Sequence, residues 1–527
     1  MNAQATNLAA LLDRRPFPGY QESIPTFRSL LVFHDPQCES SAARAHVLDL
    51  TERLADEPEA PPRRVSIPCV YDGEDLPDVA RAAGMTQAEL VRLHAGHDWR
   101  VFIVGFTPGF PYLGIGDPRL DIPRRATPRL RVPAGSVAMA RAQTGIYPWV
   151  TPGGWHLIGR TDPGLLFDLH RDPPSTCLPG DEVRFQPVAE LPPPAPRTGS
   201  GPVPAEAVGE AAFEVERGGL QTTVQDLGRP GHQRYGVPPS GAADPRSLIL
   251  ANRLVGNPDR AAGLECLLPG PVLSFRRPVL CALGGADHRA TLHRPGRPAW
   301  PIPVGLSFLA PRRAVLRFTG PPTGMRVYLA CAGGVEAPEV LGSRSTYLTA
   351  GFGGYRGRAL RSGDRISLGE APANARESRY LREARRPPVE GDLRLRISLG
   401  PQEDCFTADC LEGLEAGRWT VSNDANRMGF RLAGPRLEHR PGRSEIVSDA
   451  NPPGTIQTPP AGRPIVLGPD RGTTGGYPKL GSVVGPDLGA LAQALPGTGV
   501  RFEVVSLEQA RSIALAEARR LEALGVG

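Results

Sequence analysis

Val101-Phe-Ile-Val-Gly-Phe106 is a short apolar run that ends in glycine and an aromatic ring, and it opens a new pattern in the chain. Similar runs follow at 157–159, 165–169 and 182–185, broken by glycine and proline. Short apolar runs between turn residues are typical of buried strands. Several such strands in close succession indicate a small, closed or nearly closed β-barrel.

The same pattern of short strands and Gly-Asp or Pro-Gly turns continues across residues 212–370 and 392–505. Upstream, residues 1–90 have an α/β pattern, with a strand expected at Arg64–Tyr71. We also expect helices at the following positions: 41–55, from the capping box Thr86-Gln-Ala-Glu89 through His94, Asp244–Leu254, and Ser506–Leu524. The chain is therefore predicted to be mainly β with an α/β domain at its start.

Composition fits a soluble globular protein of several domains, with 40% hydrophobic and 22% charged residues among 527. The net charge of +5 is uneven, because the first 200 residues have a small acidic excess and the remainder a larger basic one. The basic part could attract an anionic substrate, or the two parts could attract each other.

Several classes of function are disfavoured. No basic tract interleaved with aromatic residues indicates nucleic-acid binding, and no apolar stretch has the length of a membrane span or a signal core. Eight scattered cysteines without a Cys-x-x-Cys pair argue against a disulfide framework or a structural zinc site. We expect a cytoplasmic protein with no bound metal, no nucleic acid and no membrane partner.

Lys479 is the single lysine of the chain, and every other basic residue counted with it is arginine. A compact ammonium and a broad guanidinium are not interchangeable at a tight site, so the lysine marks either a functional position or a survivor of compositional bias. Because the chain has no other lysine, its sequence excludes two lysine-dependent motifs. The chain has neither the Gly-Lys-Ser/Thr of a phosphate-binding P-loop nor a lysine between two methionines that would accept biotin.

Three loop-rich segments could line a site. The first spans Gly105–Gly114 and continues through 131–137, 143–147 and 152–156. Its glycine-rich backbone can approach a flat ligand, and Gln143 can satisfy both the oxygen and the N–H edge of an amide. Arg125 and Arg160 are further polar candidates. The alternative is a set of rigid turns that cover one end of a barrel.

The second segment, 222–253, holds the polar residues Asp226, Arg229, Asp244 and Asn252 among glycines. Asp–Arg pairs of this kind are often structural. The third combines 426–431, 454–457 and 470–479, with its cations at Arg427, Arg431, Arg471 and Lys479. Together with backbone N–H groups of a glycine-rich loop, these cations suit phosphate or another anion.

These segments carry a resemblance to known families. Residues from about 20 to 188 resemble the allophanate hydrolase subunit 1 family, which includes the Kip inhibitor and the B subunit of 5-oxoprolinase, through Phe106–Leu113, Pro133–Val137, Gln143–Pro148, Pro152–Trp155 and Ile158–Thr161. Residues 212 to about 508 resemble the allophanate hydrolase subunit 2 family, which includes Kip antagonists and the C subunit of 5-oxoprolinase, through Thr222–Arg229, Gly236–Asp244, Ala251–Asn257, Gly353–Arg358, Asn426–Leu432, Ile456-Gln457 and Thr473–Leu480.

The resemblance implies multiple cyclophilin-like β-barrels, one in the N-terminal half and two in the C-terminal half, beneath an α/β lid. The expected division is an α/β domain at 1–95, a carboxyltransferase C/D-like barrel at 96–190, a Pro-rich linker at 191–211, a carboxyltransferase A/B-like barrel at 212–385, a second barrel at 386–508 and a C-terminal helix at 506–527. A fold of this kind does not by itself imply an activity.

The resemblance also implies a reaction. The same modules form the carboxyltransferase region of urea carboxylase, where carboxybiotin donates CO2 to urea. In 5-oxoprolinase they act with a separate A subunit, while ATP drives opening of the 5-oxoproline lactam to glutamate. Both substrates are planar amides whose oxygen gains negative charge on activation, so fixed donors near that oxygen would promote either reaction.

We therefore expect a fused B–C component of ATP-dependent 5-oxoprolinase that uses Mg-ATP, carries no covalently attached biotin and needs a separate 5-oxoprolinase A subunit. The order of the halves and the missing biotin lysine favour this hypothesis. A carboxyltransferase for urea with a separate biotin carrier and a Kip-type regulator of a histidine kinase are the alternatives. Association into a homo-oligomer is a further possibility that the sequence leaves open.

Candidate residues follow from this chemistry. The residues expected to handle charge and the nucleotide are Asp226, Arg229, Arg427, Asp470, Thr473, Thr474, Gly475, Gly476 and Lys479. Those expected to contact the planar amide are Gln143, Tyr147 and Gln457.

Overall fold

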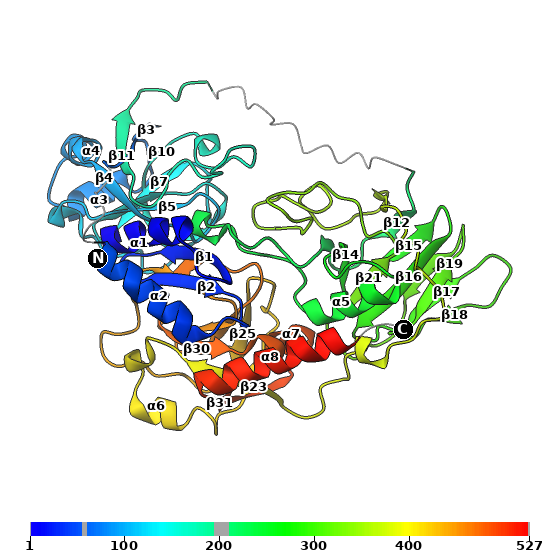
Figure 1. The fold of residues 1–527 in the computed structure, drawn as a ribbon. Helices are drawn as coiled ribbons and strands as arrows, with labels where there is room; N and C mark the ends of the chain where they lie inside the picture. The colour runs from blue at the N-terminus through cyan, green and yellow to red at the C-terminus, as the bar shows by residue number, and fades with distance from the viewer. Residues whose placement is uncertain (1, 55–60, 194–209, 525–527) are drawn as a thin grey trace.

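The computed structural model describes residues 2–54, 61–193 and 210–524. Most of the expected linker at 191–211 lies outside these ranges. Figure 1 shows three β-rich bodies, with the blue and cyan N-terminal half beside the green first barrel and the orange second barrel. The mainly β fold class, with closed or nearly closed barrels in both halves, is confirmed.

The N-terminal lid is formed by two helices and a hairpin: α1 (Asn2–Arg14), α2 (Ser40–Arg53), β1 (Tyr20–Pro25) and β2 (Leu30–His34). Leu8, Leu11 and Leu12 lie on one face of α1 because their spacing follows the helical repeat, and they pack with Phe17 and Leu50 in one apolar cluster. The lid therefore has a small core of its own, and the helix expected at 41–55 is present as α2.

A seven-stranded sheet follows, in the order β10-β7-β8-β5-β4-β11-β3. Its strands are β3 (Arg64–Cys69), β4 (Trp99–Val104), β5 (Pro111–Gly114), β7 (Ser136–Ala140), β8 (Gln143–Ile146), β10 (His156–Arg160) and β11 (Glu182–Pro187). A bridge between Val70 and Arg160 joins the two edges, so the barrel is nearly closed. A short separate pair is formed by β6 (Arg129–Val132) and β9 (Thr151–Gly153).

The helices α3 (Leu76–Ala82) and α4 (Gln87–Gly96) pack on this barrel, and α4 begins at the expected capping box of Thr86 with Glu89. The strand expected at 165–169 is wrong. Asp162 instead accepts a hydrogen bond from the Gly164 N–H at 2.9 Å and starts a 3-10 turn, η2 (Pro163–Leu165). Proline and glycine after an aspartate favour this turn over a strand. A second 3-10 turn is η1 (Pro118–Leu120).

The first barrel of the C-terminal half consists of two sheets around one core, in the orders β18-β17-β20-β15-β12-β22 and β13-β14-β21-β16-β19. Its strands are β12 (Phe213–Arg217), β13 (Thr222–Gln225), β14 (Gly263–Leu267), β15 (Val272–Phe275), β16 (Val279–Gly285), β17 (Ala290–His293), β18 (Trp300–Pro301), β19 (Ser307–Ala310), β20 (Val315–Phe318), β21 (Arg326–Cys331) and β22 (Arg365–Ile366). The expected helix is present as α5 (Pro245–Leu254), which packs on β16 and β21.

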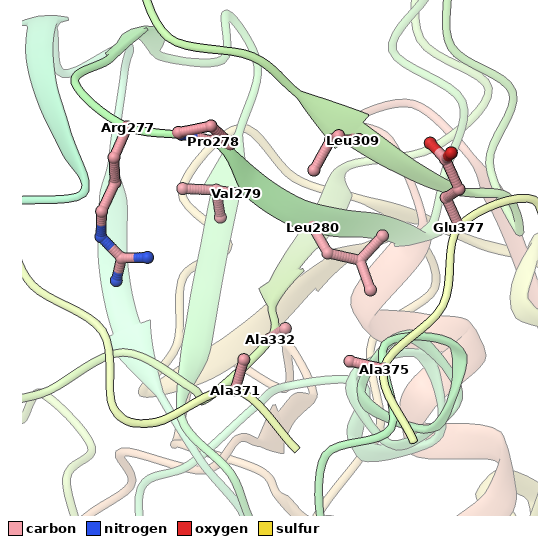
Figure 2. Close-up of a pocket in the computed structure, with 9 residues that line it drawn as sticks. All are labelled: Arg277, Pro278, Val279, Leu280, Leu309, Ala332, Ala371, Ala375 and Glu377. Atoms are coloured by element: carbon pink, nitrogen blue, oxygen red, sulfur yellow. The ribbon is translucent and has the colours of Figure 1, made fainter. Parts of the chain in front are cut away.

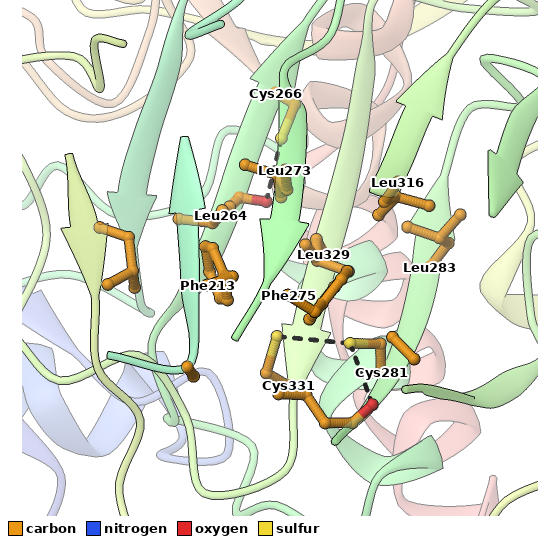
Figure 3. Packing of buried hydrophobic residues seen from close by; sticks show 14 of the residues in the cluster. Phe213, Leu264, Cys266, Leu273, Phe275, Cys281, Leu283, Leu316, Leu329 and Cys331 are labelled. Atoms are coloured by element: carbon orange, nitrogen blue, oxygen red, sulfur yellow. Dashed lines mark hydrogen bonds between the residues drawn. The ribbon is translucent and has the colours of Figure 1, made fainter. Parts of the chain in front are cut away.

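Figure 3 shows how side chains from both sheets fill this core. Phe213 and Phe275 pack 5.7 Å apart between ring centres, and Leu329 is completely buried beside them. Cys281 and Cys331 lie opposite each other on β16 and β21, with their sulfur atoms 3.7 Å apart as free thiols. The alternating inward residues of these strands thus form the largest apolar cluster of the described chain.

The second barrel is closed, in the order β23-β30-β27-β28-β25-β24-β31. Its strands are β23 (Leu393–Leu399), β24 (Trp419–Val421), β25 (Gly429–Ala433), β27 (Thr455–Gln457), β28 (Ile465–Leu467), β30 (Lys479–Val483) and β31 (Gly499–Val504). Helices α6 (Ala408–Glu412) and α7 (Gly485–Gln493) and the turns η4 (Arg382–Ala384) and η5 (Glu403–Cys405) complete this region.

The final helix, α8 (Leu507–Ala523), begins at a capping box between Ser506 and Gln509, as expected. Arg511 near its start donates hydrogen bonds to lid carbonyls, including that of Pro36 at 3.2 Å. Arg253 of the first barrel donates to the Leu524 carbonyl just beyond its end at 3.1 Å. The helix thus links the lid to the first barrel. No helix within the described ranges is long and apolar enough to cross a membrane.

The central position of Leu329 generates a test of this core. Leu329→Ala should lower the free energy of unfolding by about 2–5 kcal/mol, because it leaves a cavity that close-packed strands cannot fill. Leu220→Ala removes an equal side chain that is 64% exposed and should change stability by less than about 0.5 kcal/mol. Urea unfolding followed by tryptophan fluorescence measures both, and equal midpoints would contradict this packing.

Candidate functional site

Lys479 begins strand β30 and lies buried, with its ammonium Nζ 2.6 Å from the Asp449 carboxylate. Asp449 belongs to β26 (Asp449–Ala450), which pairs with β29 (Thr474–Gly475). The same carboxylate accepts a hydrogen bond of 2.5 Å from the Ser29 hydroxyl of the lid. The lone lysine is therefore paired with an acid that also contacts the other half of the chain.

The protonation state of this pair follows from its surroundings. Burial alone would raise the pKa of Asp449, but the charge of Lys479 and hydrogen bonds from Lys479 and Ser29 outweigh it and hold that pKa below its usual value. The carboxylate thus stays ionised at neutral pH. A compact ammonium at this position satisfies it without the width of a guanidinium.

Gln457 lies next to this pair, since β27 and β30 place it in register with Lys479. Its amide nitrogen donates to the Asn451 side chain at 3.1 Å. A Cβ on Gly475 would lie 2.4 Å from the same nitrogen, so a larger residue there would displace the Gln457 amide. The structure therefore brings together three residues that the sequence analysis selected: Gln457, Gly475 and Lys479.

Thr473 and Thr474 precede the two glycines and are both buried, and the Thr473 hydroxyl has no hydrogen-bond partner among the described residues. A Cβ on Gly105 of the first half would lie 2.2 Å from the Thr474 hydroxyl, and one on Gly472 would lie 3.2 Å from the Phe106 carbonyl. The first and third loop segments of the sequence are thus packed against each other. We call this contact the seam, formed by Gly105, Phe106, Tyr112, Ser448, Asp449, Gln457, Thr473–Gly476 and Lys479.

A second set of buried polar contacts holds the halves together. Glu22 of β1 accepts hydrogen bonds from the Gly231 and Gln233 N–H groups at 2.9 Å each and from the Gln233 side chain at 2.6 Å. Gln233, which begins η3 (Gln233–Tyr235), accepts in turn from Arg471. Burial lowers the pKa of Arg471 to about 10, and its Nε donates to the Asn451 carbonyl at 2.8 Å.

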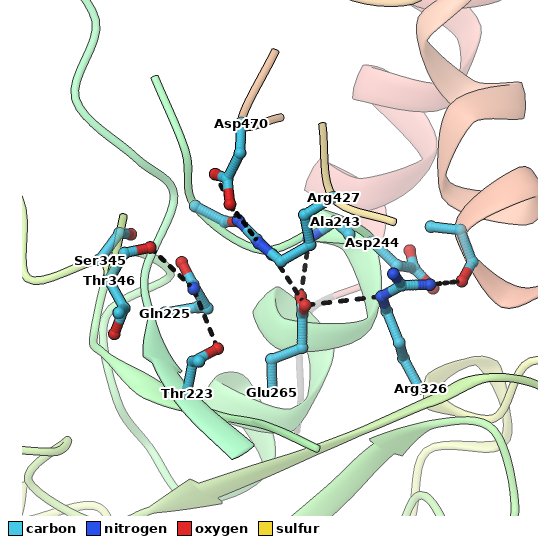
Figure 4. Close-up of polar contacts among 12 residues, drawn as sticks. Thr223, Gln225, Ala243, Asp244, Glu265, Arg326, Ser345, Thr346, Arg427 and Asp470 are labelled. Atoms are coloured by element: carbon cyan, nitrogen blue, oxygen red, sulfur yellow. Dashed lines mark hydrogen bonds and ion pairs between the residues drawn. The ribbon is translucent and has the colours of Figure 1, made fainter. Parts of the chain in front are cut away.

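Arg427 joins the two barrels of the second half, because it pairs with Asp470 within the second barrel and with Glu265 of the first, as Figure 4 shows. Asp470 receives Arg427 Nε at 2.8 Å, and Glu265 of β14 receives Nη1 at 2.7 Å. The remaining nitrogen donates to the Gly241 carbonyl at 2.7 Å. Burial would lower the pKa of Arg427, but the charges of Asp470 and Glu265 raise it above its usual value. All three guanidinium nitrogens are occupied by the protein.

The same network extends around Glu265. Tyr328 donates to its second oxygen at 2.8 Å, and Arg326 lies 3.5 Å from the first. Burial alone would raise the pKa of Glu265, yet Arg427 and Arg326 lower it. This arrangement joins β14, β21 and the loop before β25, and it fixes the two barrels relative to each other.

Asp226 and Arg229 both organise the loop at 340–345. The Asp226 carboxylate accepts hydrogen bonds at 2.7 Å from the Gly228 N–H, the Ser343 hydroxyl and the Arg344 N–H. Arg229 donates to the Ser345 and Val340 carbonyls and lies over the Phe352 ring at 5.2 Å. Burial lowers its pKa to about 10. These contacts fit the structural alternative for an Asp–Arg set.

Gln143 and Tyr147 belong to the first barrel. Gln143 starts β8 and packs beside Gly114. Tyr147 is buried with its ring edge-on to Phe110 at 5.0 Å, and burial raises the pKa of its hydroxyl. Within the described chain no hydrogen bond joins Gln143 to the second half. Of the three residues chosen for the amide, Gln457 is therefore the one that lies on the seam.

The hydrogen-bond and ion-pair partners that position these residues were not predicted from the sequence: Glu22, Gln233, Asp449, Glu265 and Arg326. Each is distant in sequence from the residue it contacts, and no short motif includes it. One signal was present. A single buried lysine requires an acidic partner, although its position along the chain is not encoded locally.

A surface pocket of about 230 Å3 lies apart from these residues, on the first barrel of the second half (Figure 2). Its walls are largely apolar and come from β16, β19 and two loops: Arg277, Pro278, Val279, Leu280, Leu309, Ala332, Ala371, Ala375 and Glu377. None of the residues selected from the sequence lines it.

With this geometry in place, comparison with known proteins defines the class. Residues 1–177 match the family described as carboxyltransferase domain, subdomain C and D, and residues 235–504 match carboxyltransferase domain, subdomain A and B. The chain belongs to this carboxyltransferase-domain family and joins both parts in one polypeptide.

Particular relatives then distinguish the halves. The C-terminal half is similar to the C subunit of 5-oxoprolinase from Escherichia coli, with 37% identity over 56% of this chain and 93% of that protein. The N-terminal half is similar to the B subunit of 5-oxoprolinase from Bacillus subtilis, with 42% identity over 34% of this chain and 81% of that protein. Urea amidolyase of Lachancea kluyveri is 32% identical over 60% of this chain, which spans 18% of that longer protein.

A solved structure resembles the whole arrangement. The crystal structure of TTHA0988 has 39% identity and a TM-score of 0.81, covering 95% of this chain and 97% of its own. The pairing of a lid, a first barrel and two further barrels is therefore shared by another protein that contains both halves.

The buried ion pair generates a prediction with a matched control. Arg427→Met should destabilise the fold by about 3–5 kcal/mol, because it leaves Glu265 and Asp470 as uncompensated buried charges. Arg431→Met alters an exposed arginine two residues into the following strand and should change stability by less than about 0.5 kcal/mol. Thermal unfolding reports both changes, and an unaltered Tm for Arg427→Met would show that the pair does not join the barrels.

Proposed function

We propose that this chain is the fused B–C component of an ATP-dependent 5-oxoprolinase, which activates the lactam of 5-oxoproline for hydrolysis to glutamate together with a separate A subunit. The observation that carries the proposal is the seam. Counterparts of the B and C subunits occur in one chain, and their glycine-rich loops pack against each other around Lys479 and Gln457.

The residues on the seam suit a planar amide. The Gln457 amide presents both a donor and an acceptor, and it adjoins the fixed positive charge of Lys479. A positive charge and fixed donors stabilise an amide oxygen that becomes more negative during activation. Asp449, whose pKa is held below its usual value, lies 2.6 Å from the Lys479 ammonium and fixes its position.

A nucleotide phosphate fits the neighbouring residues. The Thr473 hydroxyl is buried without a partner among described groups, and it lies in the glycine-rich stretch that contains Gly475. When bound, ATP would supply the phosphoryl group that makes the lactam oxygen a leaving group. Arg427 and Asp470 do not enter this proposal, since their polar atoms are occupied at the barrel interface.

The proposal is tested by measuring 5-oxoproline-dependent release of ADP and glutamate when the full chain is mixed with a candidate A subunit. Turnover is expected only with both components and ATP. Transfer of CO2 from carboxybiotin to urea, without lactam hydrolysis, would contradict the proposal and support the carboxyltransferase alternative. Inhibition of a histidine kinase without either reaction would support a regulator instead.

Lys479→Arg gives a specific prediction for the same assay. The wider guanidinium cannot reproduce a 2.6 Å contact at this buried position without shifting Asp449 and Gln457. We expect kcat to fall by roughly tenfold to a hundredfold, the scale that small misplacements produce, while circular dichroism stays unchanged. Arg394→Lys, at an exposed arginine of β23, serves as the control. Unchanged kinetics would mean that the lone lysine has no part in turnover.

A further inference from the structure

Arg124 is a half-buried cation for which no hydrogen bond or ion pair is found within the described chain. Its neighbours differ. Arg125 is paired with Asp75 at 2.8 Å, and Arg129 is paired with both Asp75 and Glu74 at the same distance. The loop thus neutralises Arg125 and Arg129 and leaves the half-buried Arg124 without a counter-ion among the described residues.

The uncompensated guanidinium faces the second half of the protein. A Cβ on Gly476 would lie 3.3 Å from Arg124 Nη2, so the group sits directly over that glycine. The Gly476 carbonyl accepts from the Ile446 N–H at 3.0 Å, whereas its own N–H donates to no described residue. Both residues are only partly buried and can be reached by a small ligand.

Two hydroxyl groups complete the surroundings. Tyr112 is buried on β5 close to Arg124, Thr474 and Ser448. Burial raises the pKa of Tyr112, although the Arg124 charge and the hydroxyls of Thr474 and Ser448 oppose this rise, so its hydroxyl remains a protonated donor. The buried Thr474 hydroxyl lies beside it, close enough to affect this pKa, and no described carbonyl or carboxylate accepts a hydrogen bond from it.

We propose that Arg124, the Tyr112 and Thr474 hydroxyls and the Gly476 N–H form a subsite for the carboxylate of the lactam substrate. A guanidinium and several convergent donors match the two oxygens of a carboxylate. The inference rests on the proposed function and deepens it, because it transfers Thr474 and Gly476 from the nucleotide to the substrate. The phosphate groups are left to Thr473, Gly475 and Lys479.

The subsite would also determine specificity. A neutral amide such as urea leaves Arg124 without its counter-ion, and a site built for a polar group rejects ligands that lack it. A lactam that carries a carboxylate next to its ring nitrogen supplies both the planar amide and the anion. The subsite thus selects a carboxylated lactam over urea or an uncharged lactam.

Equilibrium binding to the full chain tests this assignment without requiring turnover. Isothermal titration with 5-oxoproline, 2-pyrrolidinone and Mg-ADP separates the carboxylate, the bare lactam and the nucleotide. Arg124→Gln should weaken 5-oxoproline binding by about tenfold or more, the usual effect of losing a charge-assisted hydrogen bond. Binding of 2-pyrrolidinone and Mg-ADP should remain unchanged. Arg131→Gln, at an exposed arginine of the same region, should alter none of the three.

Each other result contradicts the subsite. Equal 5-oxoproline affinity in Arg124→Gln and the unaltered protein, or no 5-oxoproline binding to the unaltered protein, overturns it. If Arg124→Gln loses only Mg-ADP binding, the arginine contacts phosphate instead of the carboxylate. If it weakens binding of both lactams equally, the arginine has a structural role. Thermal unfolding shows whether each variant is folded, and Arg124→Lys serves as a further variant that keeps the positive charge. Carboxylate-dependent binding without ATP-coupled hydrolysis would uphold the subsite and reject the proposed function.

Discussion

Glu22 places a carboxylate in the contact between the two halves, where it is only 2% exposed. A buried carboxylate is costly unless its lone pairs are filled, and here three N–H donors from Gly231 and Gln233 fill them. Gln233 also accepts a hydrogen bond from Arg471, which connects Glu22 to the second barrel of the C-terminal half. These groups satisfy one another only across the interface, so they fix the position of the lid relative to the two barrels of the C-terminal half. The geometry of the seam depends on that position.

Charge explains why the halves fit together. The first half has an acidic excess and the second a basic one, and the sequence left open whether this served a substrate or the contact itself. The structure supports the contact, since Asp13 of α1 pairs with Arg234 at 2.8 Å and Ser29 of the lid binds the Asp449 that holds Lys479. The cations left over at the seam are then few. Arg124 stands out among them because it is half-buried while Arg125 and Arg129 beside it are paired with Asp75.

Much of the fold follows from local sequence, and most of the site does not. The helix starts at Thr86 and Ser506 were recognisable because each capping box is satisfied within one helical turn. The segment 165–169 was misjudged because the turn formed by Asp162 and Pro163 overrides an apolar run. Gln457 and Lys479, selected separately from the sequence, lie next to each other in paired strands, whereas Arg427 and Asp470 fill an interface. That difference depends on Glu265, which lies more than a hundred residues away and carries no local signal.

The central claim is that the two halves form one unit through the buried contacts of Glu22 and through the seam, and not merely through the segment that connects them. The most direct measurement is gel filtration after a protease site inserted within residues 194–209 has been cut to completion. The account predicts that the two fragments co-elute at the size of the uncut protein and separate when Glu22→Gln removes the interfacial charge. Fragments of the unaltered protein that elute separately would contradict it.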